Sequence, residues 1–422
     1  MVFGVKKMND NVKQFFPRLR FQSFKASGPW EFQPLGKLAK RSVRKNVDGK
    51  ITRVLTNSAE YGVVDQRDFF EKDIANQNNL EGYYLVEEGS YVYNPRVSTM
   101  APVGPISKNK IGLGVISPLY TVFKFNSKNN DFYTHYFKST HWHHYMRQVS
   151  STGVRHDRMN ISNNAFMELP LPVSTPEEQQ KIANCLSSLD ALLTAEVQKL
   201  DALKKYKKGL LQQLFPREGE TLPKLRFPNF QGTTEWKIYP LGDFIEEYRK
   251  KSTYQDEYDV LTSARNGLIK QREYYDNERI TERNNVGFNI IPVNYITYRS
   301  RSDDRRFYFN ENNLGITGII STYYPVFRIN KGINKFFIEL LAQYAEYVGK
   351  HSVGTSQTVL SLNELRRIKL PIPTEAEQQD IANCLYSFDN LIVAQAQKVK
   401  TLKTFKKGLL QQIFPKVNEV IL

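Results

Sequence analysis

Two segments of the chain, residues 175–216 and 374–415, carry the same stripe of apolar residues at helical spacing. Apolar side chains recur every three or four residues, and polar side chains dominate the other faces, as in an amphipathic α-helix that buries one narrow face. The first stripe comprises Ile182, Leu186, Leu189, Leu193, Val197, Leu200, Leu203, Tyr206, Leu210 and Leu214. The second comprises Ile381, Leu385, Phe388, Ile392, Ala396, Val399, Leu402, Phe405, Leu409 and Ile413.

Signals for helix ends flank both stripes. Thr175, Pro176 and Glu178 can form a capped first turn, with Pro176 at the first helical position and Glu178 completing a capping box. The second segment repeats the box with Thr374 and Glu377, and both segments end at a Phe-Pro dipeptide. We therefore predict two long helices with matching boundaries.

Neither helix is expected to be stable alone. Ten buried side chains at roughly 1.5 to 3 kcal/mol each cannot offset the entropy of ordering about 40 residues at roughly 1 to 2 kcal/mol apiece. We predict that the two helices pack against each other as an antiparallel coiled coil, roughly 60 Å long and related by a pseudo-two-fold axis. The alternative is that each helix packs on its own domain.

The duplication extends beyond the helices. A Pro-Arg-Leu-Arg-Phe motif at residues 17–21 recurs as Pro-Lys-Leu-Arg-Phe at 223–227, and residues 91–126 align without a gap with residues 295–330. The repeating unit is therefore about 200 residues long. Alternating apolar and β-branched residues predict strands in the aligned region, whereas 132–149 and 335–348 are predicted helices. The fold class is α+β, with two similar α/β domains.

From this repeat we place the first domain at 1–173 and the first long helix at 174–216. The second domain spans 217–373, and 374–422 comprise the second long helix and a tail. The Leu-Arg-Phe motif follows the Phe-Pro helix end inside the chain, and its N-terminal copy would follow the second Phe-Pro if the termini were joined. The termini are therefore expected to lie close together, which makes the molecule pseudo-cyclic.

Composition adds a partner class. The formal net charge of +16 favours a polyanionic partner, although many basic proteins have none. Aromatic residues make up 13% of the chain, which indicates folded basic surfaces rather than a disordered basic tail.

Cys185 and Cys384 share one helix register. We expect both to be small buried hydrophobic residues in a reducing compartment, with a disulfide as the alternative. The sequence contains no long apolar run, so we expect a cytoplasmic protein without a membrane span.

The two repeats differ most in two pairs of segments. Residues 94–110 diverge from 298–314, and residues 150–162 diverge from 351–361, within an otherwise similar framework. This pattern is what a protein needs if two related domains read two different targets. Drift in unimportant loops would produce the same pattern.

Catalytic motifs are hard to find. The sequence has no glycine-rich phosphate loop, no His-Glu-x-x-His and no Asn-Pro-Pro-aromatic tetrapeptide. His141, His143 and His144 lack a cysteine or acidic partner at ligand spacing, so a metal site is disfavoured. These observations shift the interpretation from catalysis towards binding.

Basic and polar residues gather in the divergent segments. Arginine can hold guanine O6 and N7 with two hydrogen bonds, and an amide such as that of Gln357 can do the same for adenine. Lysine and hydroxyl side chains suit phosphate contacts that position the protein. The candidate DNA-binding residues are Asn94, Arg96, Lys108, Lys110, Arg155, His156, Arg158, Arg299, Arg301, Arg305, Arg306, His351, Ser352, Thr355, Ser356 and Gln357.

These motifs together resemble one known family. The motifs PLPxxxxxEQQKIAxxL, KKGLLQQLFP, VYNPR, GVISPLYTVF, GVRHDRMNIS and GTSQTVLS are similar to those of specificity subunits of type I restriction-modification systems. The resemblance covers nearly the whole chain in both halves. The second repeat departs from it at two places, where ITYRS replaces VYNPR and STYY replaces SPLY.

The resemblance implies two target recognition domains separated by an antiparallel helix pair that acts as a ruler. Each domain would read one half of a split site in double-stranded DNA. The chain itself would be non-catalytic and would recruit two methyltransferase subunits and, through them, restriction subunits that act as motor and nuclease. S-adenosylmethionine, ATP and Mg are then expected on those partners and not on this chain.

Two other functions stay open from the residues alone. One is a stand-alone DNA-modifying enzyme or nuclease with unfamiliar motifs. The other is a scaffold that binds acidic protein partners instead of DNA.

Overall fold

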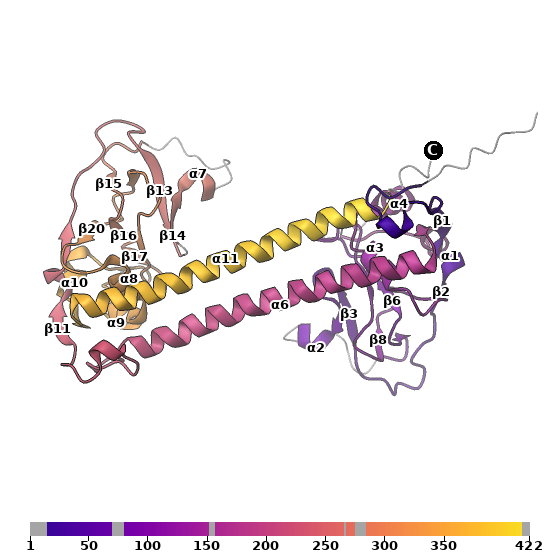
Figure 1. Cartoon of the computed structure of the whole chain (residues 1–422), viewed down its shortest axis with the longest axis horizontal. Helices are drawn as coiled ribbons and strands as arrows, with labels where there is room; N and C mark the ends of the chain where they lie inside the picture. Colours follow the sequence, from indigo (N-terminus) through magenta and orange to yellow (C-terminus); the bar gives the residue numbers. More distant parts are fainter. Residues whose placement is uncertain (1–14, 70–79, 152–156, 266, 275–283, 416–422) are drawn as a thin grey trace, which may run out of the picture. The chain divides into compact units, whose positions relative to one another are not determined.

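A computed structural model describes residues 15–69, 80–151, 157–265, 267–274 and 284–415 (Figure 1). The chain divides into two compact units. Unit 1 comprises Met1–Glu196 and Lys398–Leu422, and unit 2 comprises Val197–Gln397. The two long helices, α6 (Pro176–Leu214) and α11 (Glu375–Ile413), each contribute one part to either unit. Each unit therefore contains a mixed domain and its own section of helix pair.

The domain of unit 1 is built on a four-stranded antiparallel sheet in the order β2-β9-β6-β7. Its strands are β1 (Glu31–Pro34), β2 (Ala39–Arg41), β3 (Leu55–Ser58), β4 (Gly62–Asp65), β5 (Tyr84–Val86), β6 (Tyr91–Tyr93), β7 (Ile106–Lys108), β8 (Gly114–Ile116), β9 (Thr121–Phe125) and β10 (Pro170–Val173). Its helices are the 3₁₀ turn η1 (Gln22–Phe24), α1 (Leu35–Leu38), α2 (Gln66–Phe69), α3 (Asp131–Tyr136), α4 (His143–Val149) and α5 (Asn163–Met167).

The domain of unit 2 repeats this plan with the sheet β12-β20-β16-β18. Its strands are β11 (Lys237–Pro240), β12 (Ile245–Glu247), β13 (Asp259–Ala264), β14 (Gly267–Lys270), β15 (Asn289–Ile291), β16 (Ile296–Tyr298), β17 (Arg301–Ser302), β18 (Phe309–Glu311), β19 (Gly318–Ile320), β20 (Val326–Ile329), β21 (Thr358–Val359) and β22 (Lys369–Ile372). Its helices are η3 (Pro228–Phe230), η4 (Leu241–Asp243), α7 (Gln271–Tyr274), α8 (Asn334–Gln343), α9 (Ala345–Lys350) and α10 (Leu362–Arg367).

The domain that precedes each long helix is closed by the strand leading into that helix. In unit 1, β10 pairs antiparallel with β1, and in unit 2, β22 pairs with β11 in the same way. The aromatic cores correspond as well, because Trp30 in unit 1 and Trp236 in unit 2 are both buried at the base of the domain. The predicted α+β class with two similar domains and long helices is confirmed.

The two helices predicted after the sheet strands are each broken in two. Residues 132–149 form α3 and α4, and residues 335–348 fall in α8 and α9. A buried aromatic side chain at each break makes a hydrogen bond outside the helix. Trp142 Nε1 donates to the carbonyl of Phe137 at 3.2 Å, and Tyr344 Oη donates to the carbonyl of Pro216 at 2.8 Å. These contacts lie at the breaks between the helices, and the 3.6-residue period of the sequence does not predict them.

The long helices pair antiparallel within each unit. In unit 1 the beginning of α6 and the end of α11 share one core, which includes Ile182, Leu186 and Ile413. In unit 2 the end of α6 and the beginning of α11 share another, which includes Leu214 and Ile381. The prediction of an antiparallel pair is confirmed inside each unit, because residues late in one helix contact residues early in the other.

Ion pairs follow the same antiparallel order. Glu196 of α6 lies 2.6 Å from Lys398 of α11 in unit 1, and Lys207 lies 2.6 Å from Asp389 in unit 2. The predicted helix-pair core residues are buried or half-buried in the structure: Ile182, Leu186, Leu189, Leu193, Leu200, Leu203, Ile381, Leu385, Phe388, Ile392, Val399 and Leu402.

Four side chains on the helices differ from the prediction, among them Ala396 of the second stripe, which is exposed. Tyr206 and Phe405 were assigned to the apolar stripe, but they are 61% and 58% exposed. Cys185 was expected to be a buried hydrophobe, but it is exposed, whereas Cys384 is half-buried and both thiols are free. Adjacent residues on a helix differ by about 100° in direction, so a position beside the stripe can face solvent.

The first turn of each long helix is capped by threonine but lacks the predicted reciprocal bond. Thr175 Oγ1 accepts from the amide of Glu178 at 3.3 Å. The carboxylate of Glu178 does not return to the cap, because Arg20 binds it through Nε and Nη2 at 2.7 Å each. Arg226 binds Glu377 in the same way in unit 2. Each capping box is therefore replaced by a buried arginine–glutamate pair.

The same motif also contacts the end of the partner helix in its unit. The amide of Leu19 donates to the carbonyl of Gln412 at 3.0 Å, and the amide of Leu225 donates to the carbonyl of Gln213 at 2.9 Å. The motif at residues 17–21 therefore lies against the end of α11. Its copy at residues 223–227 lies against the end of α6. The contact with α11 brings the first described segment against the last one, while the termini themselves, residues 1–14 and 416–422, lie outside the described residues.

Candidate nucleic-acid interface

The divergent segments meet in each unit. In unit 1 the amide of Val97 donates to the carbonyl of Asp157 at 2.9 Å, and the amide of Met159 donates to the carbonyl of Pro95 at 2.9 Å. In unit 2 the corresponding segments form the antiparallel pair β17–β21. Each pair of variable segments, far apart in sequence, therefore forms one short two-stranded surface on a shared framework.

Two arginines stand directly opposite each other on this surface in unit 1. Arg96 and Arg158 are partners in an antiparallel bridge. Like charges at directly opposed strand positions are destabilising. Within the described ranges, the carboxylate that pairs with Arg158 is that of its neighbour Asp157, at 3.9 Å from Nε. Such a pair is stabilised by an anion or a set of acceptor atoms, which a nucleic acid supplies.

A groove of about 210 Å³ lies beside the arginine pair. Asn94, Arg96 and Arg158 line it together with several polar side chains that the sequence did not single out: Thr56, Gln66, Ser117 and Tyr120. Amide, hydroxyl and guanidinium groups at one groove offer both donors and acceptors, as reading base edges requires. Leu119 adds a 59% exposed apolar side chain to the lining.

The framework around the groove is rigidly held. Asn94 Nδ2 donates to the carbonyl of Asn57 at 3.0 Å, and its Oδ1 accepts from the amide of Arg96 at 3.0 Å. The hydroxyl groups of Thr56 and Tyr120 lie 3.1 Å apart and share a hydrogen bond. Asn94 therefore orients the backbone before Arg96.

Unit 2 places a different arginine on the corresponding surface. Arg301 begins β17, and its guanidinium carbon lies 4.0 Å from the centre of the Tyr323 ring. Ser300 fastens the same tyrosine, because its amide and hydroxyl both donate to the Tyr323 carbonyl, at 3.1 and 2.6 Å. The arginine is thus held by stacking.

The remaining predicted residues of unit 2 spread over a wider surface. Arg299 and Arg305 are exposed, and Arg305 has a positive φ of 58°. Gln357 Nε2 lies 3.4 Å from Asp303 Oδ1, which keeps Gln357 beside the loop that follows β17. Thr355 and Ser356 are exposed close to Gln357 in the chain, whereas His351 packs on Tyr347 and Ser352 Oγ donates to the carbonyl of Gly349.

Two predicted lysines of unit 1 are placed elsewhere. Lys108 Nζ lies 2.8 Å from Asp131 Oδ1 and near the ring of Tyr91, so this ammonium group already has a carboxylate partner. Burial alone would raise the pKa of Asp131, but the hydrogen bond and charge of Lys108, together with the charge of Lys110, outweigh it and lower that pKa. Lys110 is exposed just after the end of β7. Arg155 and His156 lie outside the described residues.

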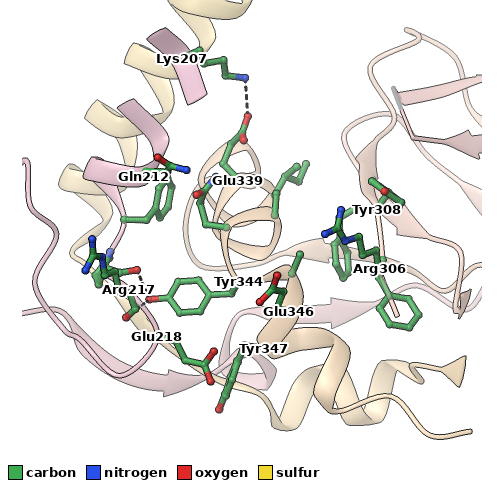
Figure 2. Close-up of a pocket in the computed structure, with 18 of the residues that line it drawn as sticks. Lys207, Gln212, Arg217, Glu218, Arg306, Tyr308, Glu339, Tyr344, Glu346 and Tyr347 are labelled. Carbon is green, nitrogen blue, oxygen red and sulfur yellow. Dashed lines mark hydrogen bonds and ion pairs between the residues drawn. The ribbon is translucent and has the colours of Figure 1, made fainter. Parts of the chain in front are cut away.

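A cleft of about 1210 Å³ lies within unit 2. Figure 2 shows Lys207, Gln212 and Arg217 on the side of helix α6, with Arg306 and Tyr308 on the opposite side. Carboxylates also line this cleft, among them Glu218, Glu339 and Glu346. Basic side chains line it too, and Glu218 and Glu339 already form ion pairs with Lys350 and Lys207, so the lining is of mixed charge. We assign the cleft no role in the DNA interface, although Arg306 is one of the predicted residues.

Half-buried charges join each domain to its section of helix pair. In unit 2, Lys335 of α8 lies 2.6 Å from Asp389 of α11 and 2.7 Å from Glu339. Lys207 of α6 reaches the same two carboxylates. Burial alone would raise the pKa of Asp389, but hydrogen bonds from Lys207 and Lys335 hold it below its usual range.

Unit 1 builds the corresponding cluster with a histidine. Asp190 of α6 forms ion pairs with Lys406 of α11 and with Lys138. His135 of α3 lies behind them, with Nε2 at 3.0 Å from Ser187 Oγ and Nδ1 at 3.8 Å from Asp190. Burial lowers the pKa of His135 to about 4, so the imidazole is neutral near pH 7. Both clusters lie at the helices and hold the domain in place.

Throughout the described ranges, no cluster of three or more histidine, cysteine or acidic side chains could hold a metal ion. Of the helices that the structure describes, none combines the length and hydrophobicity needed to cross a bilayer.

Comparisons with known proteins agree with this organisation. A family described as the type I restriction modification DNA specificity domain matches residues 33–205 and again residues 233–404. The type I restriction enzyme MjaVIII specificity subunit of Methanocaldococcus jannaschii is 23% identical over 331 residues, which is 70% of this chain and 72% of that protein.

Solved structures share the fold at low sequence identity. The S subunit of a type I restriction-modification system from M. genitalium matches with a TM-score of 0.54 at 14% identity, covering 95% of this chain and 100% of that one. A chain from a study of assembly and conformational transition in a type I R-M system matches with a TM-score of 0.53 at 14% identity, covering 91% and 97%. With both repeats matched by the family, the chain belongs to the type I restriction-modification DNA specificity family.

Proposed function

We propose that this chain is the DNA-reading subunit of a type I restriction-modification complex. Each unit reads one half of a split site in double-stranded DNA, and helices α6 and α11 set the distance between the halves. One observation carries the proposal. On a framework built twice, the variable segments of each unit join into one surface that presents arginine, Arg96 and Arg158 in one unit and Arg301 in the other.

Two linked DNA-binding units recognise a site more specifically than one unit alone. Once one unit is bound, contact by the second becomes intramolecular, so two short and weak half-sites give a specific site together. The helix length supports the ruler role, because 39 residues in α6 and in α11 correspond to roughly 58 Å at 1.5 Å per residue.

We assign the chemistry to partner subunits. Two methyltransferase subunits bind this chain and carry S-adenosylmethionine for adenine methylation, and restriction subunits with ATP and Mg join through them. The named specificity subunit from Methanocaldococcus jannaschii, similar over most of its length, supports this division of labour. Within it, the present chain positions the complex and holds no reacting group.

Two measurements test the proposal. The full-length chain is incubated with a library of random duplexes, and the bound DNA is sequenced; we expect two short motifs at a fixed spacing. Methylated adenines are then mapped in cells that carry the chain with its methyltransferase subunit, and they should fall inside the same motif. A purified chain that transfers methyl groups or cuts DNA without partners would contradict the assignment, as would duplex binding without sequence preference.

A further inference from the structure

The same turn carries an exposed apolar residue in both units. It links β8 to β9 in unit 1 and β19 to β20 in unit 2, and each is closed by a backbone hydrogen bond, Tyr120 to Ser117 at 3.0 Å and Tyr324 to Ser321 at 2.9 Å. The residue at the tip differs, because Leu119 in unit 1 corresponds to Tyr323 in unit 2. A single exposed apolar residue is ordinary. The contacts of Tyr323 make it informative.

The Arg301 guanidinium stacks on the Tyr323 ring, which leaves the edge of the guanidinium free to bind a ligand. The ring centre lies 4.0 Å from the guanidinium carbon, which is stacking distance. The N–H donors of arginine point outward in the guanidinium plane, so stacking leaves them available as a planar fork. In the described part of the chain, no carboxylate forms an ion pair with Arg301, in contrast to Lys108 in unit 1.

A planar fork in DNA recognition can bind a phosphate or a guanine edge. Phosphates are the same in every sequence, so a phosphate contact has no reason to change between two domains on one framework. This position does change, because Val97 and Leu119 of unit 1 stand where unit 2 has Arg301 and Tyr323. The difference favours a base contact.

We propose that Arg301 reads a guanine in the half-site bound by unit 2 and that Tyr323 is a positioning residue that holds its guanidinium in the reading orientation. Arg301 and Tyr323 would therefore determine one base of that half-site, and unit 1 would use its arginine pair instead. The proposal rests on the proposed DNA-reading function. Beyond that function, Arg301 selects the guanine, and Tyr323 orients Arg301.

The test compares base preferences of full-length variants in the random-duplex selection. We expect Arg301→Ala to lose the preference for one guanine in one half-motif and to leave the other half-motif unchanged. Tyr323→Leu should weaken the same preference about tenfold, since it removes the stack and leaves the fork mobile. Tyr323→Phe keeps the ring and should retain it. Tyr254→Leu, an exposed tyrosine of the same unit, serves as the matched control.

Three results separate the outcomes. If Arg301→Ala weakens binding equally for all sequences and lowers the salt dependence, the arginine binds phosphate and the proposal is overturned. If Tyr323→Leu behaves like the wild type, Tyr323 has no positioning role. If the wild type itself selects no two-part motif, the proposed function has failed and this assignment fails with it, whereas the first two results overturn only the roles of Arg301 and Tyr323. Melting curves of all variants confirm that they are folded, which the 51% exposure of Tyr323 leads us to expect.

Discussion

Arg226 holds the carboxylate of Glu377 through two hydrogen bonds of 2.7 Å, at a site where the Glu377 side chain is only 1% exposed. Removing the arginine would leave a buried charge without a partner. We expect Arg226→Ala to lower the free energy of unfolding by about 3 to 5 kcal/mol, as measured by urea denaturation. Replacing both residues together by apolar ones should restore much of the loss, because no charge then stays buried.

The matched control is an arginine with a carboxylate partner at the surface. Arg249 lies 2.7 Å from Glu247, but its side chain is 80% exposed. Arg249→Ala is expected to leave the urea midpoint unchanged, because water already solvates both groups. Equal effects of the Arg226 and Arg249 substitutions would show that burial does not decide the strength of these pairs.

The opposed arginines of unit 1 predict opposite effects on folding and binding. Arg158→Ala removes repulsion towards Arg96 and should leave the free chain equally stable or a few tenths of a kcal/mol more stable. The same substitution should weaken duplex binding by about 1 to 3 kcal/mol. Calorimetry of the free chain and duplex titrations at several salt concentrations measure the two effects.

A surface arginine outside the groove provides the control. Arg367 is 75% exposed and paired with Glu364, and Arg367→Ala changes the net charge by the same amount as Arg158→Ala. If both variants lose the same affinity, the effect comes from total charge and not from the groove.

Unit 1 should lose stability in mild acid because of a buried imidazole. The pKa of His135 is about 4 in the folded chain, against about 6.5 for an exposed histidine. Between these values the unfolded chain takes up a proton that the folded chain does not, so stability falls as the pH falls. The free energy of unfolding is lowered by on the order of 2 kcal/mol at pH 5, and this effect is absent above about pH 7.

His135→Gln removes this contribution. We expect the variant to show a smaller drop in unfolding free energy from pH 7.5 to pH 5, while its value at pH 7.5 reports any packing cost separately. The drop should not vanish, because burial also lowers the pKa of His143 to about 4. Parallel curves for variant and wild type would exclude His135 as a titrating group.

The proposed ruler predicts a defined change in spacing. Removing residues 198–204 from α6 together with the facing residues 391–397 of α11 takes one heptad from each helix. Seven residues correspond to about 10 Å, or about three base pairs, so the selected half-motifs should move closer by that amount. An unaltered spacing in a folded variant would contradict the ruler.

Deleting the heptad from α6 alone is the control. It shifts Lys207 away from Asp389, which lies 2.6 Å away in the intact protein, and misaligns the apolar stripes. We expect lower stability and no homogeneous new spacing.

Local patterns predicted the long helices almost to the residue. The caps and the apolar period are encoded within the helix itself, and the observed bounds are Pro176–Leu214 and Glu375–Ile413. The partner of Glu178 was not predictable in this way, because Arg20 lies 158 positions earlier. The repeat did contain a signal for this pair, because Arg20 recurs as Arg226 and its partner Glu178 recurs as Glu377.

The candidate site shows the same limit. Divergence between repeats identified the segments that carry Arg96, Arg158 and Arg301, because that comparison needs only the sequence. Their pairing across the surface depends on strand register between distant segments, which no local pattern encodes. Tyr323 was missed for this reason: its role appears only once the turn and β17 lie together.

The hydrogen bond from Leu19 to Gln412 has a consequence for engineering. Because the motif at residues 17–21 contacts the end of α11 as its copy contacts the end of α6, a linker could join residue 415 to residue 15, and new ends could be opened between residues 217 and 222. Such a circular permutant would keep every framework contact while exchanging which reader is synthesised first. Chain order and reading order are thus separable properties of this molecule.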